Sequence, residues 1–184
     1  MSKVAGCVLT GGASRRMGRD KATLEVGGIP MARRVAGSLT AAGIAPIAYV
    51  GGDHDALAAL GHTVIADRWP GEGPLGGLLT ALRWSPAARI FVASCDLPRL
   101  TETTVSTLLA AVPGDAHAVL AFTDRIEPLC AIWDVEHTAP ALQAAFDAGE
   151  RSIRHALRGI PVRRVEFGDD PALRDVDTEA DLGD

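Results

Sequence analysis

Cysteine is scarce in this chain of 184 residues, which contains only Cys7, Cys95 and Cys130. An odd number of widely separated cysteines without C-x-x-C spacing argues against a disulfide framework and against a zinc cluster. We therefore expect the cysteines to be small members of the core, and we assign none of them as a nucleophile.

Aromatic residues are also few, at 4% of the chain, and acidic residues outnumber basic ones by 23 to 18, for a net charge of -5. This balance argues against nonspecific binding of nucleic acid, because a protein that binds the phosphate backbone usually carries a basic face. Trp69, Trp84 and Trp133 are too sparse to form a base-stacking surface. The five histidines show no metal-ligand spacing such as H-E-x-x-H. No nucleic-acid partner is expected.

Long apolar runs are missing as well. No run approaches the roughly 20 residues that are needed to cross a bilayer. The N-terminal segment lacks the long apolar stretch of a signal peptide, because Gly11-Gly12 and Arg15-Arg16 interrupt it early. We therefore expect no membrane partner and a cytoplasmic location.

What the sequence does contain is an alternation of short apolar runs with helical segments, which is typical of βαβ units and favours a largely parallel sheet. The predicted strands are Val4–Leu9, Pro46–Val50, Thr63–Ala66, Arg89–Ala93, Ala118–Phe122, Leu129–Trp133 and Val162–Phe167. The predicted helices are Pro30–Ala41, Leu75–Trp84, Thr101–Ala111, Val135–Ala148 and Ser152–Leu157. The turn at residues 123–125 is too short for a crossover helix, so its flanking strands should be antiparallel or splayed and the sheet mixed. With 47% hydrophobic residues and no low-complexity linker, residues 1–184 are predicted to form a single domain.

A glycine-rich basic loop follows the first predicted strand, at the edge of the sheet where open α/β proteins bind ligands. Its glycines and cationic residues are Gly11, Gly12, Arg15, Arg16, Arg19 and Lys21. Glycines let backbone N–H groups approach phosphate oxygens, and arginine and lysine neutralise phosphate charge. The loop has neither the G-x-G-x-x-G nor the Walker spacing, so neither a dinucleotide loop nor a P-loop is supported. From these residues alone, a triphosphate site and an ordinary turn with solvated basic residues both stay open.

A second chemical centre is Asp96, which follows the apolar strand at Arg89–Ala93 and precedes Pro98. A carboxylate at this edge beside a triphosphate suits Mg²⁺, which favours one or two carboxylates together with phosphate oxygens and waters. Alternatively, Asp96 shapes the turn at Pro98 or caps the helix that begins near Thr101.

Three further segments carry candidate ligands. Asp175 and Asp177 lie two apart in an extended segment and point the same way, so they can add a metal contact, although Asp177 can instead cap a short helix. The glycine-rich segment at residues 71–77 opens a helix whose N-terminus favours an anion, unless it is a plain βα loop. Ser152 and Arg154 belong to a basic segment that either holds a phosphate of a second substrate or forms a solvated helix face.

The stretch from Leu9 to Lys21 reads L-T-G-G-A-S-R-R-M-G-R-D-K and resembles the L-A-G-G-x-S-x-R-M-G-x-D-K signature of the molybdenum cofactor guanylyltransferases. Other parts of the chain similar to that family are Asp67, Gly73-Pro74-Leu75-Gly76-Gly77, Cys95-Asp96-Leu97-Pro98, Glu127-Pro128-Leu129-Cys130 and Asp175-Val176-Asp177-Thr178. The resemblance therefore spans nearly the whole chain. Thr10 stands where the family usually has Ala, and Asp175 and Asp177 stand where it tends to have Asn.

This resemblance implies an α/β protein with a three-layer α/β/α arrangement, a mostly parallel mixed sheet and a Rossmann-like nucleotidyltransferase fold. It implies the transfer of GMP from GTP to the terminal phosphate of molybdopterin, with Mg²⁺ as cofactor and pyrophosphate as the leaving group. Molybdenum-inserting and cofactor-accepting proteins are the implied protein partners. Together with the chemistry above, it makes Lys21, Arg15, Arg16 and Asp96 the catalytic candidates; Leu9, Thr10, Gly11, Gly12, Lys21, Asp67, Pro74, Gly76 and Asp96 the nucleotide-binding candidates; and Asp96 and Asp177 the metal ligands.

Three alternative functions stay open. Gly11 favours GTP over CTP, because the related cytidylyltransferases resemble L-A-A-G at the start of the loop, but a molybdenum cofactor cytidylyltransferase is the nearest alternative. A sugar-1-phosphate nucleotidyltransferase shares the glycine loop and the strand-end Asp, although such enzymes usually have longer chains. A noncatalytic nucleotide-binding adaptor is the alternative of another class, and the presence of Lys21 together with Asp96 argues against it.

Overall fold

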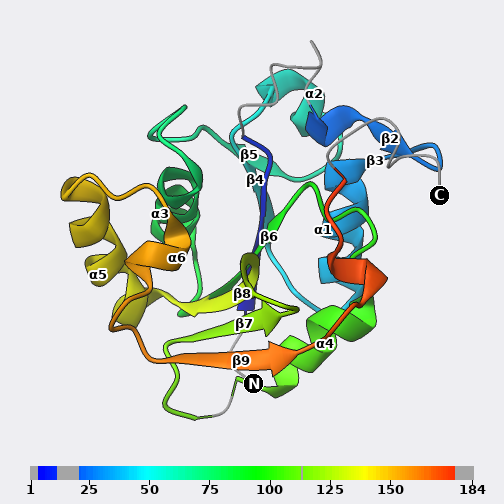
Figure 1. Cartoon of the computed structure of the whole chain (residues 1–184). Helices are drawn as coiled ribbons and strands as arrows, with labels where there is room; N and C mark the ends of the chain where they lie inside the picture. The colour runs from blue at the N-terminus through cyan, green and yellow to red at the C-terminus, as the bar shows by residue number, and fades with distance from the viewer. Residues whose placement is uncertain (1–3, 12–20, 113, 177–184) are drawn as a thin grey trace.

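The computed structural model describes residues 4–11, 21–112 and 114–176. Its centre is a seven-stranded sheet with the strand order β5-β4-β1-β6-β8-β7-β9 (Figure 1). The strands are β1 Val4–Leu9, β4 Ile47–Val50, β5 Thr63–Ile65, β6 Arg89–Ser94, β7 Ala118–Phe122, β8 Ile126–Asp134 and β9 Val162–Glu166, with β2 Glu25–Val26 and β3 Ile29–Pro30 in a separate hairpin. The helices are α1 Met31–Ala41, α2 His54–Ala58, α3 Pro74–Trp84, α4 Glu102–Ala110, α5 Val135–Asp147 and α6 Ile153–Ala156, with 3-10 turns η2 Lys21–Thr23 and η3 Pro171–Leu173.

One strand of the sheet is reversed. Strand β8 pairs antiparallel with both of its neighbours, β6 and β7. All other neighbouring strands of the sheet are parallel: β5 with β4, β4 with β1, β1 with β6, and β7 with β9. The mostly parallel mixed sheet is therefore confirmed, and the short turn at residues 123–125 joins an antiparallel pair as the sequence predicts.

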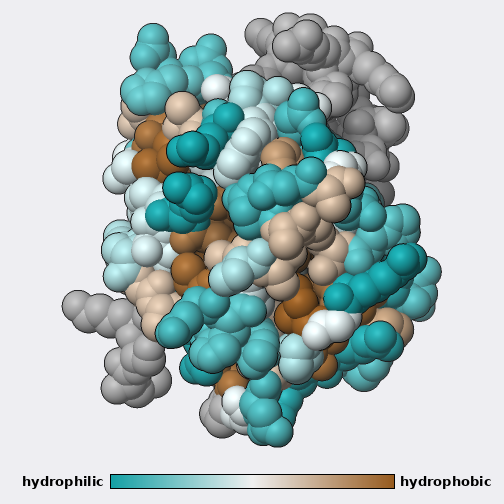
Figure 2. All heavy atoms as spheres, turned by 90° about the vertical axis from the view of Figure 1, so that its left-hand side faces the viewer, coloured by the Kyte–Doolittle hydropathy of each residue, from teal (hydrophilic) through white to brown (hydrophobic). Residues whose placement is uncertain are grey.

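Helices cover both faces of the sheet, which confirms the three-layer architecture. Helices α1 and α4 lie on one side, and α3, α5 and α6 lie on the other (Figure 1). Alternate residues of the central strands supply two separate cores: Val8 and Phe91 pack toward α1 and α4, whereas Cys7 and Val92 pack toward α3 and α5. The outer face formed by α3, α5 and α6 is mostly hydrophilic, with apolar side chains showing in patches (Figure 2).

The predicted helices are all present because the sequence supplies their end signals. The Thr101 hydroxyl caps α4 by accepting a hydrogen bond from Thr104 N at 3.1 Å, and Asp134 caps α5 by accepting from His137 N at 3.2 Å. Pro74 occupies the first turn of α3, where its missing N–H costs no hydrogen bond.

Three features of the fold differ from the prediction or were not predicted. Strand β8 begins at Ile126 rather than at Leu129, and its register with β7 shifts between Leu120 and Ala121, where a bulge lies around Pro128. Proline cannot donate to a strand ladder, so Pro128 masks the strand in the sequence while fitting the bulge in the structure. The β2–β3 hairpin and α2 are too short to give a periodic signal.

The burial of the cysteines agrees with the expectation from the sequence. Cys7, Cys95 and Cys130 are all buried, and burial raises the pKa of the Cys7 and Cys130 thiols well above the ordinary range, which suits core residues rather than nucleophiles. Within the described ranges, no helix is both long enough and apolar enough to cross a membrane.

Candidate active site

The carboxyl ends of four parallel strands meet at one edge of the sheet. Beyond the strands, Cys95 N donates to the Leu9 carbonyl at 3.0 Å, and Gly51 N donates to the Ile65 carbonyl at 2.9 Å. These bonds join the segment after β1 to the segment after β6, and the segment after β4 to the end of β5. The edge where open α/β sheets bind ligands is therefore formed by residues that follow β1, β4, β5 and β6.

Thr10 ties two of these segments together. Its side chain is buried, and its Oγ1 lies 2.9 Å from the Val50 carbonyl oxygen and 2.8 Å from that of Gly51. The Thr10 N–H also donates to the Val50 carbonyl at 2.9 Å. The hydroxyl, which stands where the resembled family usually has Ala, thus serves to hold the end of β1 against the end of β4.

Gly11 and Gly51 touch each other beside Asp67. A Cβ on Gly51, whose φ is +78°, would lie 2.9 Å from Gly11 Cα and 3.0 Å from Gly11 N. A Cβ on Gly11 would lie 3.5 Å from Gly51 Cα and 3.9 Å from Asp67 Oδ2. The structure therefore brings the predicted nucleotide residues Gly11 and Asp67 together, and it adds Gly51, which sequence reasoning missed because a Gly-Gly pair after a strand is common in turns.

The orientation of Asp67 is set by its own loop and by α3. Its Oδ1 accepts a hydrogen bond from Trp69 N at 3.1 Å and lies 3.0 Å from Thr80 Oγ1. Gly76, another predicted nucleotide residue, packs closely on this loop: a Cβ there would lie 3.2 Å from Trp69 Cβ. The visible reason for glycine at position 76 is thus the close approach of α3 to the loop, and its contact with a ligand stays a prediction.

A cavity of about 270 Å³ lies beside Asp96, and Pro74 and Asp175 also line it. The C-terminal segment reaches this place because Val176 N donates to the Asp96 carbonyl at 2.9 Å. The structure therefore places Asp175 at the same cavity as Asp96, and the role of both as metal ligands stays a prediction. Asp177 lies outside the described residues.

Three charged side chains and one hydroxyl from two further parts of the chain line the same cavity, namely Arg125, Glu127, Arg154 and Ser152. Glu127 lies 2.9 Å from Arg125 Nε and 3.5 Å from an Arg154 guanidinium nitrogen. Hydrogen bonding to Glu127, and the charge of Glu127, raise the pKa of Arg125. The pair of guanidiniums around one carboxylate leaves cationic groups beside Asp96 that can bind an anion. Sequence reasoning missed Arg125 as a site residue, and its only signal was its place next to the Glu127-Pro128-Leu129 motif.

The N-terminus of α3 is less open than the sequence implies. Leu75 N points at the Arg151 carbonyl at 3.4 Å, and a Cβ on Gly73, whose φ is +85°, would lie 3.4 Å from Arg151 Cβ. The segment just before α6 therefore packs on the start of α3, and one helix-terminal N–H is directed at protein rather than at the cavity.

Of the remaining predicted site residues, the structure describes Lys21. Lys21 begins the η2 turn, whose Ala22 is in the core beside α1. Gly12, Arg15 and Arg16 lie outside the described residues, so their predicted contacts with phosphate stay predictions.

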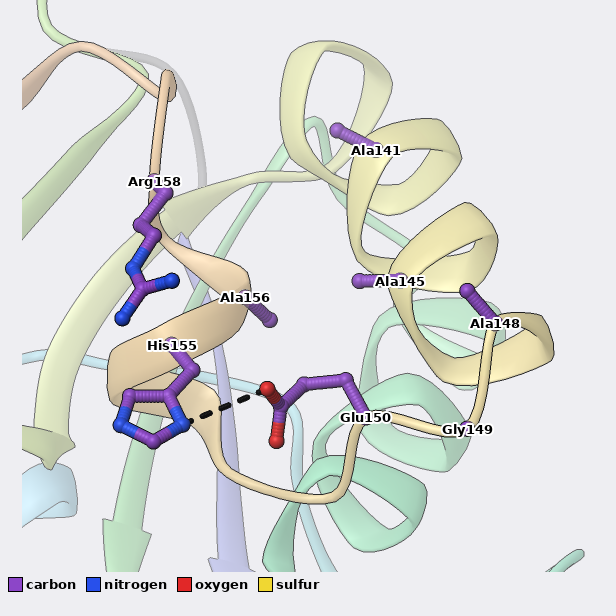
Figure 3. Close-up of a pocket in the computed structure, with 8 residues that line it drawn as sticks. All are labelled: Ala141, Ala145, Ala148, Gly149, Glu150, His155, Ala156 and Arg158. Carbon is purple, nitrogen blue, oxygen red and sulfur yellow. Dashed lines mark ion pairs between the residues drawn. The ribbon is translucent and has the colours of Figure 1, made fainter.

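A second hollow, of about 510 Å³, lies between α5 and α6 (Figure 3). Alanines of α5 form one side of it, and Glu150 and His155, whose side chains approach to 3.3 Å, lie on the other with Arg158. Of the predicted site residues that the structure describes, none lines this hollow. The chemistry gathers instead at the strand ends.

A known family matches most of the chain. The family described as "MobA-like NTP transferase domain" matches residues 6–165 of the chain. The chain belongs to this family. The matched part of the MobA-like domain includes the strand ends, Asp67, Asp96, and the cavity residues through Arg154.

Known relatives and solved structures are similar over nearly the full length. A protein of Cereibacter sphaeroides called "Molybdenum cofactor guanylyltransferase" is 34% identical over 184 residues, which cover 98% of this chain and 94% of that protein. The crystal structure of molybdopterin-guanine dinucleotide biosynthesis protein A from Archaeoglobus fulgidus has a TM-score of 0.78 at 23% identity and covers 97% of this chain and 95% of that one. The 2-C-methyl-D-erythritol 4-phosphate cytidylyltransferase from Thermus thermophilus has a TM-score of 0.74 at 16% identity and covers 99% and 96%. These structures show that the nucleotidyltransferase fold is shared, whichever base is transferred.

Proposed function

We propose that this protein transfers GMP from GTP to the terminal phosphate of molybdopterin, forming the guanine dinucleotide form of the molybdenum cofactor and releasing pyrophosphate. One observation carries the proposal: Asp96, Arg125 and Arg154 line the same cavity. This cavity lies at the edge of the sheet where β1 and β6 end side by side, and Gly11 follows β1 there. Relatives that are named molybdenum cofactor guanylyltransferases and span almost the whole chain support the choice of reaction.

The nucleotide is proposed to bind on the β1 side of this edge. Gly11 and Gly51 pack against each other there, which holds the segment after β1 beside Asp67. Asp67 faces the same surface and contacts the nucleotide. Lys21, together with Arg15 and Arg16, holds the triphosphate, because cationic groups offset its charge. Leu9, Thr10 and Gly12 complete this side, with Pro74 and Gly76 at the start of α3.

Molybdopterin is proposed to place its phosphate in the cavity on the other side of Asp96. Arg125 and Arg154 supply positive charge there, and Ser152 supplies a hydroxyl. A phosphate oxygen attacks the α-phosphorus of GTP, a new P–O bond forms, and the bond to pyrophosphate breaks. Because this nucleophile is already anionic, it needs little help from a general base. The protein's contribution is positioning and charge neutralisation.

A divalent metal is typical of nucleotidyltransferases, and the oxygen donors present suit Mg²⁺. Asp96 and Asp175 line one cavity, and Asp177 follows in the chain. Among residues 4–11, 21–112 and 114–176, no group of three or more His, Cys, Asp or Glu is arranged to hold a metal. A site with only one or two carboxylates fits Mg²⁺, because this ion keeps waters and phosphate oxygens as its other ligands. Asp96, with Asp175 or Asp177, would hold the ion, which when bound offsets the negative charge that develops at the α-phosphate.

GTP is preferred to CTP in this proposal because Gly11 matches the guanylyl form of the loop, whereas the cytidylyltransferases resemble L-A-A-G there. The molybdenum-inserting and cofactor-accepting proteins remain proposed partners, implied by a product that other proteins use.

The test compares wild type with Asp96→Asn, Lys21→Met and the control Asp169→Asn, at an exposed position after β9. Asp96→Asn and Lys21→Met should each lower turnover of GTP with molybdopterin by about 10²- to 10³-fold, because each removes an electrostatic contact to the reacting phosphates. The control should be unchanged, and all variants should keep their thermal midpoints.

Equilibrium dialysis with GTP, CTP and ATP, with and without Mg²⁺, tests the choice of nucleotide. A preference for GTP that depends on Mg²⁺ and on Asp96 is the expected result. Preference for CTP would assign the protein to the cytidylyl alternative. Near-normal Mg²⁺-dependent turnover of Asp96→Asn would defeat the metal assignment, and binding without any pyrophosphate release would favour the adaptor.

A further inference from the structure

Thr80 is a buried polar residue in the middle of α3 that makes contacts beyond its own helix. Its side chain is only 5% exposed. Its Oγ1 lies 3.0 Å from the Gly76 carbonyl oxygen, which is the usual back-bond of a helical threonine to the residue four positions earlier. The same atom also lies 3.0 Å from Asp67 Oδ1 and accepts a hydrogen bond from Arg68 N at 3.2 Å. Thr80 therefore joins α3 to the loop that carries Asp67.

These contacts distinguish the two oxygens of the Asp67 carboxylate. Oδ1 is held by the protein, because Trp69 N donates to it at 3.1 Å and the Thr80 hydroxyl lies within hydrogen-bond distance. Oδ2 is the oxygen on the side of Gly11, at 3.9 Å from the place a Cβ would occupy there. The Thr80 hydroxyl has a single proton, which it donates either to the Gly76 carbonyl or to Asp67 Oδ1. While it donates to Asp67, the carboxylate is held through one oxygen by two donors, so its other oxygen keeps a fixed direction.

The direction of Oδ2 also limits what Asp67 can recognise. An ionised carboxylate only accepts hydrogen bonds, so its partner must be a hydroxyl or an N–H group. Phosphate oxygens carry like charge and are poor partners. Asp67 therefore suits the ribose or base of a nucleotide rather than its triphosphate.

We infer that Thr80 is a positioning residue, which holds Asp67 so that Oδ2 meets the nucleoside part of the bound nucleotide beside Gly11. The inference rests on the proposed function, in which Asp67 contacts GTP. Because the nucleoside does not change during phosphoryl transfer, its contacts are equally strong in the ground state and in the transition state. Losing such a contact raises KM and leaves kcat nearly unchanged.

The primary variant is Thr80→Val, which keeps the shape of the side chain and removes the hydroxyl. It should raise the KM for GTP, and the GTP dissociation constant from equilibrium dialysis, by about tenfold, on the scale of one hydrogen bond to a charged group. The kcat and the KM for molybdopterin should stay within about twofold. Thr80→Ser, which restores the hydroxyl, should bring GTP binding back close to wild type.

Thr138 provides a matched control. It is fully buried in α5, and its Oγ1 donates to the Asp134 carbonyl at 2.6 Å, which is the same back-bond four positions earlier. Thr138→Val removes a buried helical hydroxyl without touching any proposed site residue. It should leave GTP binding unchanged, so a tenfold change in both variants would mean that the effect is general destabilisation and would overturn the inference. Should Thr80→Val fail to fold, Thr80→Ala measured against Thr138→Ala makes the same comparison.

A double-mutant cycle with Asp67→Asn separates this inference from the proposed nucleotide contact. The expected result is that Asp67→Asn weakens GTP binding and that Thr80→Val adds little in the Asp67→Asn background. Additive effects would show that Thr80 does not act through Asp67. Weaker binding in Asp67→Asn with normal binding in Thr80→Val would overturn the positioning role alone. Normal GTP binding in Asp67→Asn would show that the proposed nucleotide contact is itself wrong, and the positioning role would be wrong with it.

Discussion

At the residue scale, two glycines define the surface after β1 by touching each other. Gly51 has a φ of +78°, which side-chain-bearing residues rarely adopt, and its missing Cβ leaves room for Gly11 N and Cα. The sequence alone makes Gly11 a residue that a ligand approaches. The structure shows an additional constraint, since the main chain of the β4 end already occupies one side of Gly11.

This close contact predicts different effects for two glycine-to-alanine changes. Gly61 also has a positive φ, of +93°, but a Cβ there would meet nothing within 4 Å. Gly61→Ala should therefore lower the free energy of unfolding by about 1 kcal/mol, from backbone strain alone. Gly51→Ala adds a collision with the backbone of Gly11 and should lower it by about 3 kcal/mol or more.

Urea unfolding measures both free energies, and GTP dialysis provides a second readout. Gly51→Ala should also weaken GTP binding, since relief of the collision moves the segment after β1, whereas Gly61→Ala should bind GTP normally. Equal losses of stability in the two variants would contradict the contact between Gly51 and Gly11.

At the element scale, one segment of the cavity wall lies where a strand is interrupted. A run such as Leu129–Trp133 is recognised as a strand from its apolar residues, but the strand continues back to Ile126 through a bulge at Pro128. The bulge places Glu127, Pro128 and Leu129 in the cavity wall. Periodicity cannot reveal such a segment, because the bulge breaks the alternation on which the prediction depends.

Asp96 was predictable because the strand before it is regular and has no bulge. Asp96 follows the regular, mostly buried strand β6, and the ends of parallel strands meet at one edge of a sheet. Asp67 follows β5, which is short and less buried, and it was singled out through the family resemblance. Thr80 gave no signal in the sequence, because a threonine in a helix usually bonds only to its own turn. Its contact with Asp67 is a product of how α3 packs on the loop after β5.

The loop before α3 and the segment before α6 are held together by Arg151. Its Nε lies 2.7 Å from a Glu72 carboxylate oxygen. One of its terminal nitrogens, Nη1, donates to the Phe146 carbonyl at 3.0 Å and to the Glu150 carbonyl at 2.9 Å. The guanidinium carbon also lies 4.2 Å from the centre of the Phe146 ring. Glu72 belongs to the loop after β5, which also carries Asp67. Arg151 immediately precedes Ser152, a cavity residue.

These contacts predict that Arg151→Ala costs about 1–3 kcal/mol in free energy of unfolding, mostly from the buried carbonyl bonds and the ring contact. The half-exposed ion pair with Glu72 contributes little of this, because solvent screens it. Arg151→Lys should not restore stability, since lysine lacks the planar fork. Arg158→Ala, at the rim of the hollow in Figure 3, is the control and should stay within about 0.5 kcal/mol. Equal losses in Arg151→Ala and Arg158→Ala, measured by urea unfolding, would sink this assignment.

At the scale of the whole molecule, the proposed site and a cluster of charged side chains lie at opposite ends of the sheet. The carboxyl ends of the parallel strands carry the proposed site, whereas Asp134 and Arg89 pair at the opposite end, with their charged atoms 3.6 Å apart. His137 Nδ1 lies 2.7 Å from Asp134 Oδ1, and the rings of His137 and His117 are 4.6 Å apart between centres. A charge cluster far from the site should affect stability without affecting turnover.

The pKa shifts in this cluster give the sign of its pH dependence. Burial raises the pKa of Asp134, but hydrogen bonds from His137 and the charges of His137 and Arg89 outweigh it, so the pKa lies below its ordinary 3.8. Hydrogen bonding to Asp134, and the charge of Asp134, raise the pKa of His137 above its ordinary 6.5. The stabilisation from Asp134 is therefore present above pH 3.8 and is lost as the pH falls through the lowered value. The stabilisation from His137 is present below pH 6.5 and is lost as the pH rises through the raised value.

Asp134→Asn tests this window while keeping a capping side chain at the start of α5, since asparagine caps helices as well as aspartate does. The thermal midpoint of wild type should exceed that of Asp134→Asn by a constant amount between pH 3.8 and 6.5 and by less on either side. GTP binding and turnover at pH 7 should be the same in both proteins, because the proposed site lies at the other end of the strands. A difference in midpoint that grows as the pH rises through the raised pKa of His137 would contradict the charge pair, since His137 loses its charge there. Reduced turnover would show that the two ends of the sheet are coupled.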